Sequence, residues 1–440
     1  MHKIERLLQT LVPNGVEFKT LEEVFEIKNG YTPSKNNPEF WEKGTIPWFR
    51  MEDIRENGRI LKDSIQHITP KALKGKKLFP KNSIIISTTA TIGEHALLIV
   101  DSLANQRFTF LSKKANCGIA LDMKFFFYQC FLLGEWCKKN TNVSGFASVD
   151  MTAFKKYKFP IPPLEIQQEI VKILDAFTEL NTELNTELKA RKKQYEYYQN
   201  MLLDFKDANQ NHKDTKMSAK TYPKRLKSLL QTLAPKGVEF RKLGDIGEYI
   251  RGVTYKKNQE INNLECGIKV LRANNITLSN HLNFEDIKVI NKNVKIRKEQ
   301  YLKKNDILIC AGSGSSEHIG KVAFINTDFD YVFGGFMGVI RIHEINSRFV
   351  YHIFTSNIFK KYLEKSLNTT TINNLNANIL QNFLIPIPPL EIQQEIVKIL
   401  DQFSALTTDL LAGIPAEIEA RKKQYEYYRE KLLTFKPLKA

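Results

Sequence analysis

Two stretches of the chain repeat apolar residues at alternating steps of four and three positions. The first has Ile166, Ile170, Ile173, Phe177, Leu180 and Leu184, and the second has Ile392, Ile396, Ile399, Phe403, Leu406 and Leu410. This is the spacing of a heptad seam, which predicts long helices. The first helix should run from about residue 164 to about residue 203, a length of about 60 Å. Gly413 and Pro415 predict a kink or an interruption in the second helix.

Both helices belong to an internal repeat that divides the chain into two copies of one plan. PIPPLEIQQEIVKILD starts at residue 160 and recurs letter for letter at residue 386, and ARKKQYEYY starts at residues 190 and 420. LLQTLVPNGVEF at 7–18 returns as LLQTLAPKGVEF at 229–240. Each copy therefore has a short lead segment, a large variable region, a fixed Pro-rich corner and a long helix.

The plan predicts seven segments. They are a lead segment at 1–18, a first variable domain at 19–159, a first conserved helix at 160–203, a linker at 204–225, a repeated lead segment at 226–240, a second variable domain at 241–385 and a second conserved helix at 386–436. The apolar runs 83–88 and 306–312 predict buried strands, and 125–139 and 347–366 predict helical structure. The expected fold class is α/β: two mixed α/β domains alternate with two long helices in a pseudo-two-fold repeat.

The excess positive charge of the chain lies in the variable domains. The 440 residues include 65 basic and 48 acidic side chains, a net charge of +17. Region 19–160 has 22 basic and 14 acidic residues, a net of +8, and region 241–385 has 20 and 13, a net of +7. Such an excess on compact domains favours nucleic acid as a partner over a membrane surface. General solubility is the alternative explanation of the charge.

Other features argue against several classes of protein. No apolar run reaches the 18 residues of a membrane-spanning helix, and the start, MHKIERLLQT, does not resemble a signal peptide. The five cysteines lack a CxxC pair, which argues against a disulfide framework or a structural zinc site and favours a reducing cytoplasm. The histidines show no metal-ligand spacing, and His95 and His318 are interpreted as residues of a surface loop.

The loop AGSGSSEHIGKV at 311–322 resembles a P-loop only superficially. It has one residue too many between its glycines, and Val322 stands where Ser or Thr would bind magnesium. The first copy has STTATIGEHA there, without the glycines that a phosphate cradle needs. We therefore expect no catalytic, nucleotide or metal site, and interpret the shared Gly93 and Gly320 as turn residues.

Clusters of basic and amide side chains are the candidates for contacts with DNA. Arg can bond guanine, and Asn can bond adenine, through two hydrogen bonds in the major groove. The candidates in the first domain are Lys35, Arg50, Arg55, Arg59, Lys74, Lys76, Lys77 and Arg107. Those in the second domain are Arg251, Tyr255, Lys256, Lys257, Arg272, Asn274, Asn275, Thr370 and Asn373. Each cluster alone also fits a solvated surface or an ordinary turn.

The duplicated PIPPLEIQQEIVKILD block, each time followed by a helix that ends with ARKKQYEYY, resembles the DNA-specificity subunit of type I restriction–modification systems. Gly30-Tyr-Thr-Pro33 with Trp41 and Trp48, and Gly252-Val-Thr-Tyr255, are weaker features of that family. The resemblance covers the whole chain. It implies a target recognition domain in each variable region, each recognising one half of a split, asymmetric DNA site, with no catalysis on this chain.

The resemblance also implies partners and a frame. Two methyltransferase (modification) subunits, and two restriction subunits in the larger complex, would dock on the fixed regions. S-adenosylmethionine, ATP and Mg would then belong to those subunits, with no cofactor on this chain. The two helices would pack as an antiparallel coiled coil. One side of it would be Ile170, Ile173, Phe177, Leu180 and Leu184, and the other Ile396, Ile399, Phe403, Leu406 and Leu410.

The charge and the motifs of the sequence argue against three other functions. A coiled-coil adaptor whose domains bind proteins is disfavoured by the charge of those domains. A stand-alone DNA-binding regulator usually carries a helix-turn-helix, and no such motif is recognisable. A single-chain methyltransferase-endonuclease would need a cofactor loop and an Asn-Pro-Pro-Tyr-type motif, and neither occurs.

Overall fold

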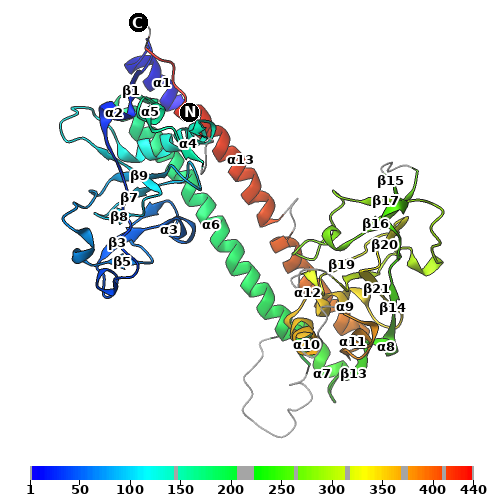
Figure 1. Cartoon of the computed structure of the whole chain (residues 1–440). Coiled ribbons are helices and arrows are strands. Elements are labelled where there is room, and N and C mark those ends of the chain that lie inside the picture. The colour runs from blue at the N-terminus through cyan, green and yellow to red at the C-terminus, as the bar shows by residue number, and fades with distance from the viewer. Residues whose placement is uncertain are drawn as a thin grey trace. The chain divides into compact units, whose positions relative to one another are not determined.

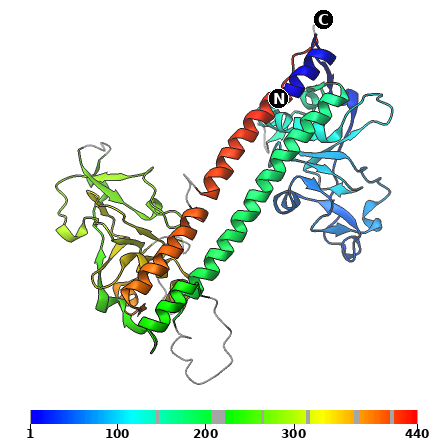
Figure 2. The ribbon, with the colours of Figure 1, turned by 180° about the vertical axis from the view of Figure 1, so that it is seen from behind.

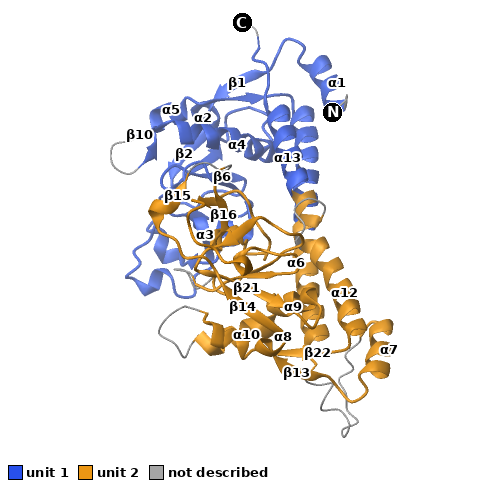
Figure 3. Ribbon diagram, turned by 90° about the vertical axis from the view of Figure 1, so that its right-hand side faces the viewer, with its two compact units in different colours: residues 1–183, 419–440 blue, residues 184–418 orange. Residues whose placement is uncertain are grey.

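The computed structural model describes residues 2–142, 147–205, 222–261, 266–312, 318–367, 375–408 and 413–438. The chain forms two compact units (Figures 1 and 3). Unit 1 contains residues 1–183 and 419–440, and unit 2 contains residues 184–418. Each unit holds one variable domain. None of the described helices is both long and apolar enough to cross a membrane.

Unit 1 is built around the first variable domain. Its elements are α1 (His2–Leu11), β1 (Glu17–Thr20), α2 (Leu21–Val24), β2 (Phe25–Asn29), η1 (Pro38–Phe40), β3 (Ile46–Phe49), α3 (Met51–Asn57), β4 (Ile60–Leu61), β5 (His67–Ile68), η2 (Pro70–Leu73), β6 (Ser83–Ser87), β7 (His95–Leu98), β8 (Leu103–Ala104), β9 (Phe108–Lys113), α4 (Met123–Lys139), β10 (Thr141–Asn142), β11 (Ser148–Val149), α5 (Met151–Lys155) and β12 (Lys158–Ile161). The helix α6 (Leu164–Leu203) starts in unit 1 and ends in unit 2, and α13 (Ile414–Leu433) starts in unit 2 and ends in unit 1.

The core of unit 1 is a five-stranded sheet of order β2-β9-β6-β7-β4, accompanied by a three-stranded sheet β5-β3-β8. All five residues of β6 are buried, which confirms the strand predicted at 83–88. The predicted helix at 125–139 is α4, which packs on β6 and β7. The surface-loop interpretation of His95 is wrong: its ring is buried in β7 against Phe127 and Phe131, because α4 covers this strand.

Unit 2 repeats this arrangement. Its elements are α7 (Lys224–Leu233), β13 (Glu239–Lys242), α8 (Leu243–Ile246), β14 (Gly247–Arg251), η4 (Lys257–Gln259), β15 (Glu260–Ile261), β16 (Ile268–Leu271), η5 (Ala273–Asn275), β17 (Lys288–Ile290), η6 (Lys298–Gln300), β18 (Ile307–Cys310), β19 (Val322–Phe324), β20 (Tyr331–Phe333), β21 (Met337–Ile342), α9 (Ser347–Phe354), α10 (Asn357–Leu367), α11 (Ala377–Gln381), β22 (Leu384–Ile387) and α12 (Leu390–Thr408). The helix α7 includes the end of the segment predicted as a linker.

The sheet order β14-β21-β18-β19 of unit 2 matches β2-β9-β6-β7 of unit 1. The pair β16·β20 is parallel, as is β3·β8. Strand β18 confirms the buried strand predicted in 306–312. The stretch 347–366 forms two helices, α9 and α10, because the Ser356 hydroxyl donates to the carbonyl of Ile353 and accepts from the amide of Ile358. Such local side-chain bonds compete with a continuous helix.

The Pro-rich corner has the same geometry in both units. Strand β1 pairs with β12, and β13 pairs with β22, in the same antiparallel register. Gln167 is fully buried, donates to the carbonyl of Pro162 at 2.6 Å and accepts from the amide of Asp122 at 2.8 Å. Because Asp122 caps α4, this glutamine ties the long helix to α4, the helix that packs on β6 and β7.

The same ties recur in unit 2. Gln393 donates to the carbonyl of Pro388 at 2.7 Å and accepts from the amide of Asn346 at 2.9 Å. Asn346 caps α9, as Asp122 caps α4. The repeated sequence therefore specifies the same junction between the long helix and the variable domain in both units, and this junction is called the joint below.

The predicted packing of one apolar seam against the other is wrong. Ile170 belongs to the core of unit 1 and Ile396 to the core of unit 2, because each faces its own variable domain. Leu180 and Leu406 are 43% and 40% exposed. Ile173 and Ile399 pack at the edges of their own cores, Leu184 is half-buried, and Leu410 lies outside the described residues.

The antiparallel helix contacts within each unit are made by aromatic residues. In unit 1, Phe177 of α6 stacks on Tyr428 of α13, with ring centroids 5.6 Å apart. In unit 2, Tyr198 of α6 stacks on Phe403 of α12 at 5.1 Å. The tyrosines of ARKKQYEYY thus fill the place expected for the opposite seam. In Figure 2 the green ribbon of α6 runs beside the orange and red ribbons of α12 and α13. As Gly413 and Pro415 predict, α12 and α13 are separate helices.

Candidate nucleic-acid interface

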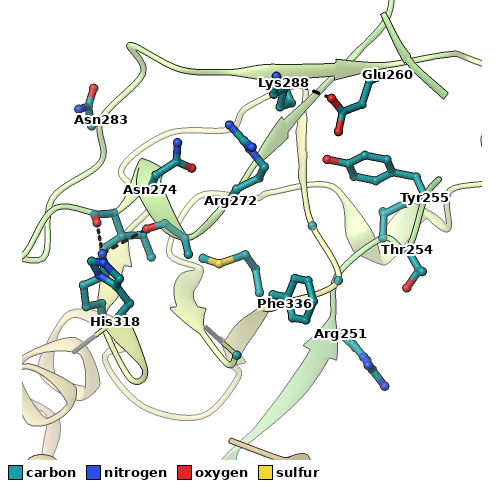
Figure 4. Close-up of a pocket in the computed structure, with 18 of the residues that line it drawn as sticks. Arg251, Thr254, Tyr255, Glu260, Arg272, Asn274, Asn283, Lys288, His318 and Phe336 are labelled. Atoms are coloured by element: carbon teal, nitrogen blue, oxygen red, sulfur yellow. Dashed lines mark hydrogen bonds and ion pairs between the residues drawn. The ribbon is translucent and has the colours of Figure 1, made fainter. Parts of the chain in front are cut away.

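The second variable domain has a basic pocket of about 1370 Å³ (Figure 4). Its walls come from the end of β14, the η5 turn and the turn that follows β20. Glu260 is its acidic lining residue, and the lining also includes Thr254, Tyr255, Asn274 and Phe336. The basic lining residues are Arg251, Lys257, Arg272, Lys288 and Lys321. A concave site with this charge can attract a polyanion.

A glycine brings two walls of this pocket together. A Cβ atom on Gly252 would lie 2.1 Å from the carbonyl oxygen of Gly334, so no other residue fits there. The close approach lets the amide of Val253 donate to the carbonyl of Phe333 at 2.7 Å, and that of Gly252 to Met337 at 3.0 Å. The Gly252-Val-Thr-Tyr255 segment is therefore fixed at the pocket edge.

Arg272 is held in the pocket by Asn275. The Asn275 side chain accepts from the amide of Arg272 at 2.8 Å and donates to the carbonyls of Asn283 and Asp286. The prediction that Asn275 contacts DNA is wrong, because its side chain is buried and already bonded within the loop. The Arg272 guanidinium donates to Asp286 at 2.7 Å, and Asn274 donates to the same carboxylate at 2.6 Å.

Lys321 is a pocket residue that the sequence did not mark. Its ammonium group donates to the carbonyls of Ala273 at 3.2 Å and Ile276 at 2.5 Å, which braces the η5 turn. Burial lowers the pKa of Lys321. Its preceding residue, Gly320, has φ +80°, and the corresponding Gly93 has φ +88°, which confirms both as turn residues.

The first variable domain has a pocket of about 330 Å³ at the corresponding place. The amide of Gly30 donates to the carbonyl of Phe108, and that of Tyr31 to Ala104, each at 2.8 Å. A Cβ atom on Gly30 would lie 2.2 Å from the carbonyl oxygen of Asn105. These contacts are the counterparts of those at Gly252. The two pockets are therefore built on the same backbone frame.

Arg50 of the first pocket and Arg272 of the second share one backbone conformation. Arg50 has φ −130° and ψ 177°, and Arg272 has φ −129° and ψ 179°. The amide of Arg50 donates to the Asp53 carboxylate at 2.6 Å, as Arg272 does to Asn275. Within the described residues, the Nε of each arginine is buried without a hydrogen-bond partner. The guanidinium of Arg50 lies 5.9 Å from the ring centroid of Trp48.

The linings of the two pockets combine identical and different residues. Thr32, Lys35 and Arg50 correspond to Thr254, Lys257 and Arg272. The pairs that differ include Glu52 with Asn274, Arg55 with Thr277, Thr91 with His318, Gln106 with Gly335 and Arg107 with Phe336. The structure thus brings into the pockets the predicted residues Lys35, Arg50, Arg55, Arg107, Arg251, Tyr255, Lys257, Arg272 and Asn274.

Other predicted contact residues lie outside both pockets. Arg59 pairs with the Glu94 carboxylate at 2.6 Å. The ammonium groups of Lys74 and Lys76 lie over aromatic rings, 5.2 and 5.1 Å from the centroids. Lys77 and Lys256 are exposed. Thr370 and Asn373 lie outside the described residues.

Across the parts of the chain that the structure describes, no cluster of three or more His, Cys, Asp and Glu residues could hold a metal ion. The loop 311–322 is described only in part, since residues 313–317 lie outside the described ranges. The lining residues of the two pockets offer positive charge, hydrogen-bonding groups and aromatic rings to a ligand.

Comparison with known proteins identifies relatives of this chain. The family described as "Type I restriction modification DNA specificity domain" matches residues 13–193 and 235–420. The EcoprrI type I restriction enzyme specificity subunit of Escherichia coli is 58% identical over 203 residues, 44% of this chain and 51% of that protein. The EcoR124I/EcoR124II specificity subunit, also of Escherichia coli, is 31% identical over 321 residues, 67% and 69% of the two chains. The alignment thus spans about half the length of the first relative.

Solved structures share the fold. One solved structure is described as the structural basis of complex assembly and conformational transition of the type I R-M system. It matches this chain with a TM-score of 0.59 at 18% identity, and the match covers 96% of this chain and 98% of the other chain. The S subunit from M. genitalium has a TM-score of 0.51 at 15% identity, with the same coverage. Because the family description matches both halves of the repeat and most of the chain, the chain belongs to the type I restriction–modification DNA specificity family.

Proposed function

We propose that the chain recognises a bipartite, asymmetric site in duplex DNA and directs adenine methylation and restriction by partner subunits. The observation that carries this proposal is the pair of basic pockets, which share one backbone frame but differ in their lining. A shared frame suits one kind of ligand, and different side chains suit different base sequences. A net charge of +7 to +8 on each variable region supports DNA as that ligand.

We further propose that two modification subunits, and two restriction subunits in the larger complex, dock on the repeated parts of the chain. Identical segments at 160–175 and 386–401 can present one surface twice, so that two copies of one partner bind. The chain itself has no catalytic role in this proposal. S-adenosylmethionine, ATP and Mg would be bound by the partner subunits.

Mapping of methylated adenines tests this proposal. The chain is expressed with its modification subunit in a host that lacks other adenine methyltransferases, and the methylated sites are sequenced. We expect one split motif, and replacing residues 241–385 with the equivalent region of a relative should change one half-site only. Methylation by the purified chain alone with S-adenosylmethionine, or a domain replacement that changes both half-sites, would contradict the proposal.

A further inference from the structure

The turn after β20 presents an aromatic side chain to solvent at the pocket of unit 2. Phe336 is 75% exposed, the highest value among the large apolar side chains of the described residues. Its carbonyl oxygen accepts from the amides of Ala311 at 2.9 Å and Gly312 at 3.0 Å, so the backbone beneath the ring is fixed. Figure 4 shows Phe336 with Arg272 and Tyr255 among the side chains that line the pocket. A ligand that enters the pocket can therefore cover this ring and gain the free energy of burying it.

Arg107 occupies the same position in unit 1. The amide of Phe108 donates to the carbonyl of Asn105 at 3.1 Å, and that of Met337 donates to Gly334 at 2.8 Å, so the two turns have one geometry. The side chain of Arg107 is exposed and lines the pocket of its unit. Its guanidinium makes no hydrogen bond or ion pair with any residue that the structure describes. Both turns therefore present an uncommitted side chain at one position of a shared frame.

We propose that Arg107 and Phe336 are specificity-determining residues, each contacting a base edge in the major groove of its own half-site. The inference rests on the proposed function and adds the residues that distinguish the two half-sites. Residues of the same type in both pockets, such as Arg50 and Arg272, offer the same chemical groups to both half-sites. The difference between half-sites must come from positions that differ, and the position of Arg107 and Phe336 changes from a cation to an apolar ring.

The chemistry of each residue identifies the base it prefers. A guanidinium binds O6 and N7 of guanine through two hydrogen bonds, and an apolar ring packs on the C5-methyl group of thymine. The neighbouring residues fit this difference. In unit 1, the hydroxyl of Thr32 donates to the side chain of Gln106 beside the turn. In unit 2, Gly335 takes the position of Gln106, and a Cβ atom there would lie 3.1 Å from Oγ1 of Thr254, so this turn approaches Thr254 closely without a side chain between them.

The methylated-site assay tests this inference with single substitutions. Phe336→Ala should weaken the preference for thymine at one position by roughly fourfold, the value of one buried methyl group. It should leave the other half-site unchanged. Arg107→Ala should weaken the preference for guanine by about tenfold or more at one position of the opposite half-site. Phe336→Arg should change the preferred base from thymine to guanine. The melting temperature of Phe336→Ala should match that of the wild type, because the ring is exposed.

A matched probe and a control separate base contacts from general binding. Replacing that thymine with deoxyuridine in a duplex of the mapped site should weaken binding of the wild-type complex about fourfold. It should leave binding of the Phe336→Ala complex unchanged. Lys257→Ala, in the same pocket, should weaken binding to all sequences alike and reduce its salt dependence by about one phosphate contact.

The possible failures are distinguishable. A wild-type complex with a split motif, whose Phe336→Ala variant keeps its full base preference, overturns this inference and leaves the proposed function standing. A variant that alters both half-sites overturns it in the same way. A wild-type complex that methylates no split motif overturns the proposed function and this inference together.

Discussion

The two long-helix corners are identical in sequence, but the domains that pack on them use different side chains. In unit 1, Asp175 of α6 accepts a hydrogen bond from the Lys124 ammonium at 2.6 Å and another from the Tyr128 hydroxyl at 2.7 Å. Both donors lie on α4, the first helix that follows the large sheet. The carboxylate is 35% exposed and is satisfied by one cation and one neutral donor.

In unit 2, Asp401 of α12 has equivalent partners of another type. The Arg348 guanidinium donates at 2.9 Å, and Nε2 of His352 lies 2.8 Å from the carboxylate. Burial opposes ionisation of Asp401, but the bond with His352 and the charge of Arg348 keep its pKa below the usual value. In both units the aspartate of the fixed helix thus meets one cation and one further hydrogen-bond donor, provided by different residues. We therefore expect that a variable domain can be exchanged without a change in the helix.

The largest expected effect comes from the apolar residues shared by both joints. Leu174 and Leu400 are fully buried, and truncating either to Ala should cost about 2–5 kcal/mol of unfolding free energy. All three tryptophans lie in unit 1, so their fluorescence follows the unfolding of that unit. Leu174→Ala should lower the urea midpoint that tryptophan fluorescence reports for unit 1. Leu400→Ala should lower the midpoint of an unfolding transition that circular dichroism reports.

Leu180→Ala is the matched control for this comparison. Leu180 follows the same heptad pattern but is 43% exposed, so its truncation should change stability by less than about 0.5 kcal/mol. A loss at Leu180 as large as that at Leu174 would mean that the seam packs on another helix along its whole length.

Buried histidines should make the two units respond differently to acid. Burial, with the charge of Arg59, lowers the pKa of His95 in unit 1 to about 3. The unfolded chain binds this proton near pH 6.5, so stability should fall as the pH drops from 6.5 towards 3, by roughly 2 kcal/mol at pH 5. Burial also lowers the pKa of His352, but the Asp401 carboxylate opposes this effect. Unit 2 should therefore lose less stability.

Fluorescence-detected urea unfolding at pH 7 and pH 5 measures the response of unit 1. His95→Leu should remove most of the acid-induced loss in the midpoint, because no proton is then bound on unfolding. An unchanged loss in His95→Leu would assign the acid response to other groups. His352→Leu, followed by circular dichroism, gives the corresponding test in unit 2.

The glutamines of the Pro-rich corner share two partners, but Gln167 also donates to the carbonyl of Ala120 at 2.9 Å. Gln393→Ala removes two hydrogen bonds and should cost about 1–2 kcal/mol, and Gln167→Ala removes three and should cost about 1 kcal/mol more. Gln168→Ala and Gln394→Ala change exposed neighbours and should have little effect. Equal losses at Gln167 and Gln393 would show that the hydrogen bond to Ala120 contributes no stability to unit 1.

Some of this organisation could be predicted from the sequence because it depends on local pattern. The repeat, the helix 164–203 and the buried run 83–88 were visible as spacing and apolar content. The surface on which the apolar seam of the helix packs could not be predicted, since the same apolar stripe can face another helix or a domain. Phe177 therefore pairs with Tyr428 rather than with the opposite seam.

The candidate site could be predicted only in part for the same reason. Basic residues were visible, but their pairing was not: Arg59 is neutralised by Glu94 from a distant loop. Asn275 lies in a segment whose Arg and Asn residues are typical of DNA contacts. Its side chain is buried because it bonds to carbonyls of its own loop, and the spacing of residues in the sequence does not indicate such bonds. Phe336 could have been found by aligning the turn after β20 with the turn at 105–108, and Lys321 by aligning Gly320 with Gly93, because the two copies retain one frame there.

The smallest expected effect isolates the donor that differs between the joints. Tyr128→Phe removes the hydrogen bond to Asp175, but Lys124 remains bound to the carboxylate, so the cost should be about 1 kcal/mol at pH 7. Burial, with the bond to Asp175, raises the pKa of Tyr128 above its value in the unfolded chain. The tyrosine therefore contributes its full stability below about pH 10, and this contribution is lost as the pH rises further.

The difference between wild type and Tyr128→Phe, measured by fluorescence-detected unfolding, should shrink between pH 9 and pH 11. His352 does not ionise in that range, so His352→Phe should show no such trend in unit 2. If the difference between wild type and Tyr128→Phe stayed constant across this range, the hydrogen bond that the Tyr128 hydroxyl donates to Asp175 would not stabilise unit 1.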